Sequence, residues 1–118
     1  MSFSFVIVDD DPAFRAVARA LLTARGFDVV GQADDVSTGI AAVSAHVPHA
    51  VLLDLQLPDG DGLSAAGSIH ASNPEVRVLL TSAGERTPSP VELADAGVSA
   101  FVPKEQLATT DLVSLLSL

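Results

Sequence analysis

The chain has 118 residues, with six Lys and Arg against fifteen Asp and Glu and a net charge of −9. This length is typical of one domain, and the scattered basic residues argue against direct nucleic-acid binding, which needs clustered Lys and Arg. The absence of cysteine excludes disulfides, thiolate metal sites and cysteine nucleophiles. Because neither a signal-peptide pattern nor a membrane-length apolar run is found, we expect a cytoplasmic protein with no membrane partner.

Short apolar runs alternate with helix-like segments along the whole chain. Runs rich in Val, Leu and Ile are typical of buried parallel strands, and the alternation predicts a single-domain α/β fold over residues 1–118. In chain order we expect strands at 4–8, 27–33, 50–55, 76–81 and 99–102. We expect helices at 12–25, 36–46, from about 63 to before Pro74, 90–96, and from Thr109 or Thr110 as the N-cap to Leu115 or Leu116. Residues 57–62 are expected to form a loop.

Polar residues stand where the apolar runs stop. Asp9 and Asp10 follow the first run, Asp54 and Thr81 end two later runs, and Lys104, the only lysine, follows the last. In an open parallel sheet, ligands bind outside the carboxyl ends of the strands. We therefore expect these side chains to converge on one edge, where they can hold a divalent cation and a phosphoryl group.

The acidic residues at this edge predict a metal site. Adjacent carboxylates such as Asp9 and Asp10 repel each other unless a cation lies between them, and Asp54 would add a third oxygen ligand. Hard oxygen ligands suit Mg²⁺, with Mn²⁺ as an alternative ion. The plainer reading, in which one of the pair caps the first helix, is weakened because Asp11 before Pro12 fits the cap better.

Asp54 is also a candidate nucleophile. A carboxylate in a buried strand is costly unless it is paired or used, and this one could accept a phosphoryl group to form an aspartyl phosphate. Lys104 and Thr81 could contact the oxygens of that group. The alternatives are an ordinary surface lysine and a strand-terminal hydroxyl bonded to nearby backbone.

Four motifs occur in order: Val6-Ile7-Val8-Asp9-Asp10-Asp11-Pro12, Leu52-Leu53-Asp54-Leu55-Gln56-Leu57-Pro58-Asp59-Gly60-Asp61-Gly62, Leu79-Leu80-Thr81-Ser82-Ala83 and Phe101-Val102-Pro103-Lys104. With these motifs the chain resembles the response regulator receiver domains of two-component signalling over essentially its whole length. The resemblance implies a flavodoxin-like, doubly wound (βα)5 fold. It has a five-stranded parallel sheet with helices on both faces.

The resemblance also implies roles for the acidic residues. Asp54 would be the phosphoacceptor and Asp10 a direct Mg²⁺ ligand, while Asp9 would act largely through water. The backbone carbonyl of Gln56 would be the remaining protein ligand. The phosphoryl donor would be a phosphohistidine on a sensor histidine kinase. The domain would be no enzyme beyond self-catalysed, Mg²⁺-dependent phosphoryl transfer and slow self-dephosphorylation.

The switch residues implied by the resemblance are Thr81, Lys104 and Phe101. Thr81 and Lys104 would move toward the phosphoryl group, and Phe101 would rotate into the vacated space. Phe101 could equally be a plain core aromatic. The output surface would comprise the fourth helix, the fifth strand and the fifth helix, and could serve an output domain beyond this chain, a downstream protein or a homodimer.

The segment before residue 90 departs from the family pattern. Pro88 and Pro90 exclude a regular helix before residue 90. We expect residues 84–89 to be a long mobile loop with low hydrogen-exchange protection, ordered on phosphorylation or partner binding.

A receiver-fold interaction module that works without phosphorylation is the alternative function, although no acidic or switch residue is lost. A Mg²⁺-dependent phosphatase with an aspartyl nucleophile would need a second Asp two residues after Asp54. Gln56 occupies that position, which argues against this class of enzyme.

Overall fold

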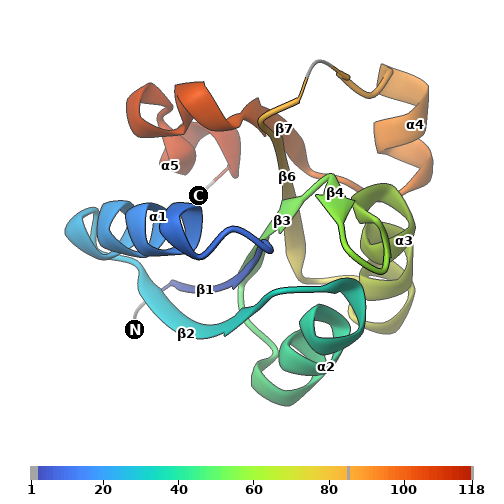
Figure 1. Cartoon of the computed structure of the whole chain (residues 1–118), viewed down its shortest axis with the longest axis horizontal. Helices are drawn as coiled ribbons and strands as arrows, with labels where there is room; N and C mark the ends of the chain where they lie inside the picture. Colours follow the sequence, from blue (N-terminus) through green and yellow to red (C-terminus); the bar gives the residue numbers. More distant parts are fainter. Residues whose placement is uncertain (1–2, 85, 118) are drawn as a thin grey trace.

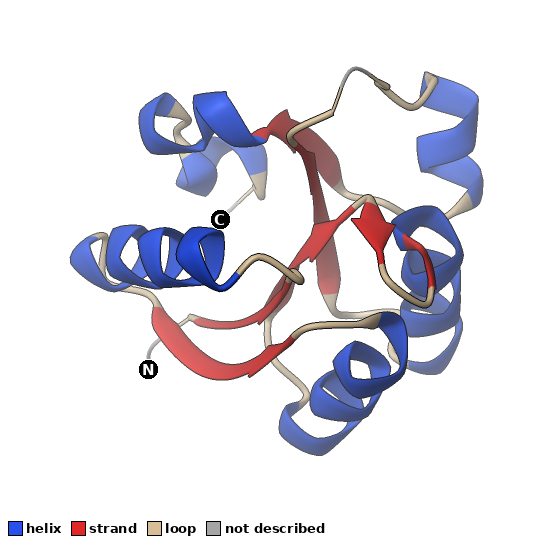
Figure 2. Ribbon diagram, viewed as in Figure 1, coloured by secondary structure: helices blue, strands red, loops and turns tan. Residues whose placement is uncertain are grey.

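The computed structural model describes residues 3–84 and 86–117, and its centre is a five-stranded parallel sheet (Figures 1 and 2). The strand order is β2-β1-β3-β6-β7, with the middle strand buried along its whole length. The strands are β1 (Ser4–Val8), β2 (Asp28–Ala33), β3 (Ala50–Asp54), β6 (Arg77–Ser82) and β7 (Ala100–Pro103). The predicted parallel α/β fold is confirmed. No strand end differs by more than one residue from its predicted position.

Helices cover both faces of this sheet. Figure 1 shows α1 and α5 on one side and α2, α3 and α4 on the other. None of the helices in the described part of the chain has the length and apolarity needed to cross a membrane. Their bounds are α1 (Pro12–Ala24), α2 (Val36–His46), α3 (Gly62–Ser72), α4 (Pro90–Asp95), η1, a 3₁₀ helix (Lys104–Thr109), and α5 (Leu112–Leu115).

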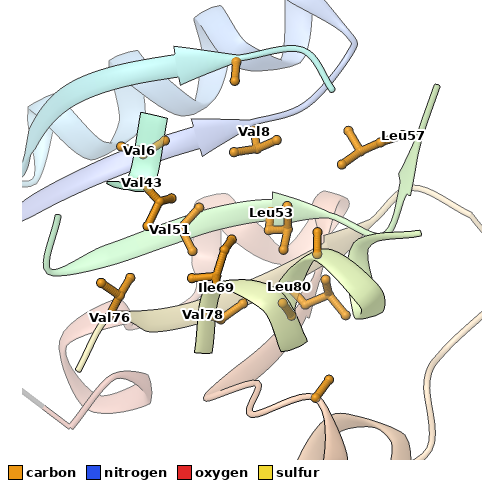
Figure 3. Packing of buried hydrophobic residues seen from close by; sticks show 14 of the residues in the cluster. Val6, Val8, Val43, Val51, Leu53, Leu57, Ile69, Val76, Val78 and Leu80 are labelled. Carbon is orange, nitrogen blue, oxygen red and sulfur yellow. The ribbon is translucent and has the colours of Figure 1, made fainter. Parts of the chain in front are cut away.

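Side chains of each strand alternate between two hydrophobic layers. In β1, Phe5 and Ile7 pack toward α1 and α5, whereas Val6 and Val8 pack toward α2 and α3. Figure 3 shows the second layer, in which valines and leucines of neighbouring strands surround Ile69 of α3. Burying one such side chain contributes about 2 kcal/mol, so this alternation fixes which face of the sheet each side chain packs against.

Sheet register brings the polar strand ends together. Val8 pairs with Leu53, which places Asp9 beside the end of β3, and Asp54 pairs directly with Thr81. The pairing of β3 with β6 extends one residue beyond Asp54, since the amide of Leu55 donates to the Thr81 carbonyl at 2.8 Å. The carboxyl edge of the three central strands therefore carries three polar residues within a few ångströms.

The predicted loop at 57–62 contains a small antiparallel hairpin, β4 (Gln56–Leu57) with β5 (Gly60–Asp61). Its turn residue, Asp59, accepts hydrogen bonds from the Val36 amide at 2.7 Å and the Ser37 amide at 3.1 Å. These bonds, the one from Val36 first, hold the pKa of Asp59 below its usual value. The hairpin thus caps the N-terminus of α2, although the two segments are well separated in the sequence.

Gly62 lets the same segment lie close to the site. A Cβ at this position would be 2.3 Å from the Asp54 carbonyl oxygen. No other residue type fits against that backbone without moving the end of β3. The approach of α3 to the phosphoacceptor candidate therefore depends on this glycine.

The predicted start of the last helix is wrong. Residues after Lys104 form η1, and α5 begins only at Leu112, with Asp111 as the N-cap accepting from the Ser114 amide at 3.2 Å. Thr110 is extended, and its hydroxyl donates instead to the Gln106 carbonyl at 2.7 Å. The threonine side chain closes the preceding turn, so it is unavailable as a cap.

Candidate functional site

Three carboxylates gather at the carboxyl edge of the sheet. Asp9, Asp10 and Asp54 each offer an oxygen that lies within 4.8 Å of the others. Asp9 is 1% exposed and Asp54 is 7% exposed, while Asp10 faces solvent. The structure thus brings together the acidic residues that the strand ends predicted, and this donor set fits a hard divalent cation such as Mg²⁺.

Lys104 reaches the same cluster from the end of β7. Its Nζ lies 2.7 Å from Asp9 Oδ2 and 3.4 Å from Asp54 Oδ2, and its side chain is only 14% exposed. The plainer reading of Lys104 as a surface lysine is therefore wrong. Burial lowers the pKa of this amine, but its contacts with Asp9 and Asp54 outweigh burial and leave the pKa above its usual value.

The electrostatics of Asp54 favour a neighbouring cation. Burial and, after it, the charge of Asp9 raise the pKa of Asp54, and the Lys104 ammonium and the Gln56 amide offset only part of that effect. A carboxylate in this position is poorly solvated and gains from any positive charge brought near it. A bound metal ion would therefore stabilise the charged form of Asp54.

Asp9 and Asp10 have different surroundings. The Asp9 carboxylate accepts from the Asp11 amide at 2.9 Å, and its backbone carbonyl accepts from Arg15 Nη1 at 2.6 Å. Asp10 makes no such contact among the described residues and instead lines the cavity beside Asp54. Asp9 is held in place, whereas Asp10 is free to meet a ligand.

A cavity of about 320 Å³ opens onto the cluster, large enough for a hydrated ion and a phosphoryl group. Its lining combines charged and polar side chains with small residues that follow β6. The lining residues are Asp10, Asp54, Gln56, Leu57, Pro58, Ser82, Ala83, Gly84 and Lys104.

Thr81 and Phe101 are not among the residues that line this cavity. Thr81 is fully buried, and its Oγ1 has no hydrogen-bond partner among the residues that the structure describes. The alternative in which this hydroxyl bonds nearby backbone is therefore wrong. Phe101 is partly buried and packs against the layer that contains Leu80, its register neighbour in β6. Thr81 is the register partner of Asp54, whereas Phe101 lies one strand farther away, in β7.

Sequence reasoning missed two contacts of the site. The Lys104 Nζ lies 4.3 Å from the centre of the Phe14 ring, and Arg15 binds the Asp9 carbonyl. Phe14 reads in the sequence as one member of the apolar stripe of the first helix, and Arg15 as one of several scattered basic residues. No sequence signal singles out either, because both contacts depend on where α1 lies against the sheet.

Comparisons with known proteins agree with this geometry. The family model described as "Response regulator receiver domain" matches residues 5–117. The probable transcriptional regulatory protein NarL of Mycobacterium tuberculosis is 34% identical over 105 residues, which are 88% of this chain and 49% of that protein. The chemotaxis protein CheY of Bacillus subtilis is 27% identical over 104 residues, which are 88% of this chain and 87% of CheY.

Solved structures lead to the same family. The signal receiver domain of the putative response regulator NarL from Mycobacterium tuberculosis has a TM-score of 0.80 and 32% identity, covering 98% of this chain and 94% of that one. A LuxR-family two-component response regulator from Aurantimonas has a TM-score of 0.85 and 27% identity, covering 97% and 81%. The chain spans about half the length of curated relatives such as NarL. The carboxyl-edge site, the sheet order and these matches agree, and the chain belongs to the response regulator receiver domain family.

Proposed function

We propose that this receiver domain accepts a phosphoryl group on Asp54, with Mg²⁺, from a phosphohistidine of a sensor histidine kinase. The observation that carries the proposal is the joint placement of Asp9, Asp10 and Asp54 with the Lys104 ammonium at one strand edge. Asp10, Asp54 and the Gln56 carbonyl would hold the ion directly, and Asp9 would hold it through water. A bound Mg²⁺ would supply countercharge to the phosphoryl oxygens.

The chemistry asks little of the protein beyond position and charge. A carboxylate oxygen of Asp54 attacks phosphorus, a P–O bond forms, and the departing imidazole nitrogen keeps the electron pair of the broken P–N bond. Lys104 moves from its contact with Asp9 to a phosphoryl oxygen and neutralises part of the added charge. Poor solvation of Asp54 favours the attack, because little hydration has to be removed first.

The buried hydroxyl of Thr81 supports a switch. A phosphoryl oxygen on Asp54 would offer Oγ1 the acceptor that it lacks among the described residues. Thr81 would move toward Asp54, and the loop after β6 would follow. Phe101 would rotate into the vacated space, which changes the surface made by α4, β7 and α5.

The output of this surface is also a proposal. Relatives such as NarL, named as a probable transcriptional regulatory protein, are about twice as long as the part matched here. We expect the α4-β7-α5 surface to act on an output domain of the same polypeptide, on a separate partner protein or on a second copy of the domain. The domain would work in the cytoplasm as a signalling module rather than as an enzyme with its own substrate.

The test is phosphorylation by a small donor. The protein is incubated with acetyl phosphate and Mg²⁺, and its intact mass is compared with that of Asp54→Asn and of Asp28→Asn, an exposed acidic residue at the start of β2. We expect one phosphoryl group on the parent and on Asp28→Asn, and none on Asp54→Asn or without Mg²⁺. Addition of the group to Asp54→Asn would contradict the assignment of the acceptor.

A negative result calls for a second measurement, since some receivers accept only from their kinase. Beryllofluoride with Mg²⁺ imitates the phosphoryl group and needs no donor. Binding that is lost in Asp54→Asn would support the proposal, and absence of binding in the parent would favour the unphosphorylated interaction module.

A further inference from the structure

The ring of Phe14 lies against the Lys104 ammonium, although the two residues come from opposite ends of the chain. The Nζ-to-centroid distance is 4.3 Å. Phe14 lies in the first turns of α1, and Lys104 is the first residue of η1. A cation within about 6 Å of an aromatic ring centre is attracted by the negative charge of the ring face.

Three contacts together define where this ammonium lies. It is 2.7 Å from Asp9, 3.4 Å from Asp54 and 4.3 Å from the Phe14 ring centre. Since only 14% of the lysine side chain is exposed, water can complete little of its coordination. The ring therefore replaces solvent on one side of the ammonium, which strengthens a cation–aromatic contact.

The ring itself is held in place. Phe14 is partly buried and packs against the hydrophobic layer that contains Leu22 and Leu107. The first turn of α1 is fixed by Asp11, whose carboxylate accepts from the Ala13 amide at 2.9 Å. Phe14 can therefore act as a rigid surface for the flexible lysine.

We propose that Phe14 is a positioning residue that holds the Lys104 ammonium between Asp9 and Asp54. In the resting domain this contact keeps Lys104 on the carboxylates that a divalent cation would need. During phosphorylation it keeps Lys104 close to the group arriving on Asp54. The inference deepens the proposed function, but its first consequence concerns the metal-free protein and can be measured without any phosphoryl transfer.

Two substitutions separate the ring face from simple packing. Phe14→Leu keeps an apolar side chain but removes the aromatic face, whereas Phe14→Tyr keeps the face. Phe27→Leu is the matched control, because Phe27 belongs to the same hydrophobic layer and contacts Phe5 rather than Lys104. Thermal unfolding of each variant measures the total loss of stability, and Phe27→Leu gives the size of a loss that comes from packing in this layer without the Lys104 contact.

The first readout is the lysine signal itself. Because Lys104 is the only lysine, isotope-labelled lysine gives one set of side-chain NMR resonances. We expect the ε-proton resonance of the metal-free protein to be displaced upfield by the Phe14 ring current, retained in Phe14→Tyr and Phe27→Leu, and lost in Phe14→Leu. An unshifted resonance in the parent would overturn the proposal, even if Phe14→Leu failed to fold.

The second readout measures Mg²⁺ affinity and the rate of phosphorylation by acetyl phosphate separately. A less firmly held Lys104 competes more weakly for Asp9 and Asp54, so Phe14→Leu should bind Mg²⁺ about two- to fivefold more tightly. Its acetyl phosphate rate at saturating Mg²⁺ should fall, while Phe14→Tyr stays within twofold of the parent on both counts. General damage to the fold would instead weaken Mg²⁺ binding and the rate together.

Three results would contradict the role of Phe14: parent-like Mg²⁺ affinity in Phe14→Leu, weaker Mg²⁺ binding in that variant, or the same gain in Phe27→Leu. A parent protein that never gains a phosphoryl group would refute the proposed function instead. The lysine resonance would still report on Phe14 in that case, so the two failures are distinguishable.

Discussion

The ammonium of Lys104 lies 2.7 Å from Oδ2 of Asp9, so a basic side chain occupies the acidic cluster of the domain. The arrangement balances charge at an edge where buried carboxylates would otherwise repel each other. It also means that a divalent cation and Lys104 compete for the same oxygens. This relationship gives the site its resting state and determines how it should respond to substitution.

Removal of the lysine charge should destabilise the metal-free domain. Lys104→Met keeps most of the apolar stem but leaves Asp9 and Asp54 without their countercharge. We expect a loss of about 2 kcal/mol, below the 3–5 kcal/mol of a fully buried pair, because the cavity is open to water. Urea unfolding in EDTA measures the loss.

Mg²⁺ should restore much of that stability by replacing the missing charge. At about one hundred times the dissociation constant, binding adds about 2.7 kcal/mol to the stability of any folded protein that holds the ion. A Lys104→Met variant as stable as the parent in EDTA would contradict the proposed role of the ion pair.

Substitution of Asp54 should change how stability depends on pH. Burial and the charge of Asp9 raise the pKa of Asp54 above its ordinary value of 3.8 in the folded protein. The folded state therefore retains a proton that the unfolded chain has lost, and stability from this group falls as pH rises through the folded pKa.

Asp54→Asn carries no such proton and should escape this loss. In EDTA, the variant should gain stability relative to the parent as pH rises from 3.8 through the folded pKa, and the difference should then level off. Denaturant unfolding between pH 3 and pH 7 measures the difference. A gap that stays constant over this range would show that Asp54 has no raised pKa.

Replacement of the Thr81 hydroxyl should separate stability from signalling. Thr81→Val keeps the shape of the side chain and removes a buried oxygen that has no partner among the described residues. We expect the unphosphorylated domain to gain about 1 kcal/mol, because an unsatisfied buried polar group is removed. Thermal unfolding measures the gain.

The same variant should still accept a phosphoryl group but should lose the change at Phe101. NMR of the phenylalanine ring with and without beryllofluoride follows that change. A destabilised Thr81→Val variant would indicate that the hydroxyl is hydrogen-bonded in the resting protein.

Residues 86–89, just before α4, have no regular secondary structure and end in a capping box. Ser89 accepts from the Glu92 amide at 3.1 Å, and its own amide donates to the Glu92 carboxylate at 3.0 Å. Arg86 forms an ion pair with the same carboxylate. Ser89→Ala removes the hydroxyl side of this capping box and should cost about 1 kcal/mol, seen as faster amide exchange in α4.

Low exchange protection remains our prediction for residues 84–89, of which Glu85 lies outside the described residues. The Gly84 and Ser89 amides should exchange most slowly, because each donates to a side-chain oxygen. The control is Asp111→Ala, which removes the cap of α5 and should leave exchange in α4 unchanged. Strong protection throughout 84–89 in the free protein would contradict the mobile-loop hypothesis.

Much of the fold follows from local patterns in the sequence. Strand and helix positions depend on periodicity and on the residues at element ends, so Asp11 before Pro12 predicts the start of α1 correctly and Pro90 predicts the start of α4 correctly. Local patterns do not predict the start of the last helix correctly. Thr110 and Asp111 are both suitable N-caps by residue type, and only the turn made by η1 decides between them.

The candidate site also has a part that the sequence predicts and a part that it does not. Patterns in the sequence are enough to place Asp9, Asp10, Asp54, Thr81 and Lys104 at strand ends. They are also enough to predict that these residues meet, because parallel strands in one sheet end at one edge. The folded chain adds that Lys104 lies nearer to Asp9 than to Asp54, that Phe14 covers its ammonium and that Asp59 caps α2. These contacts join segments far apart in the chain, and they depend on how helices pack against the sheet, which no local pattern of residues encodes.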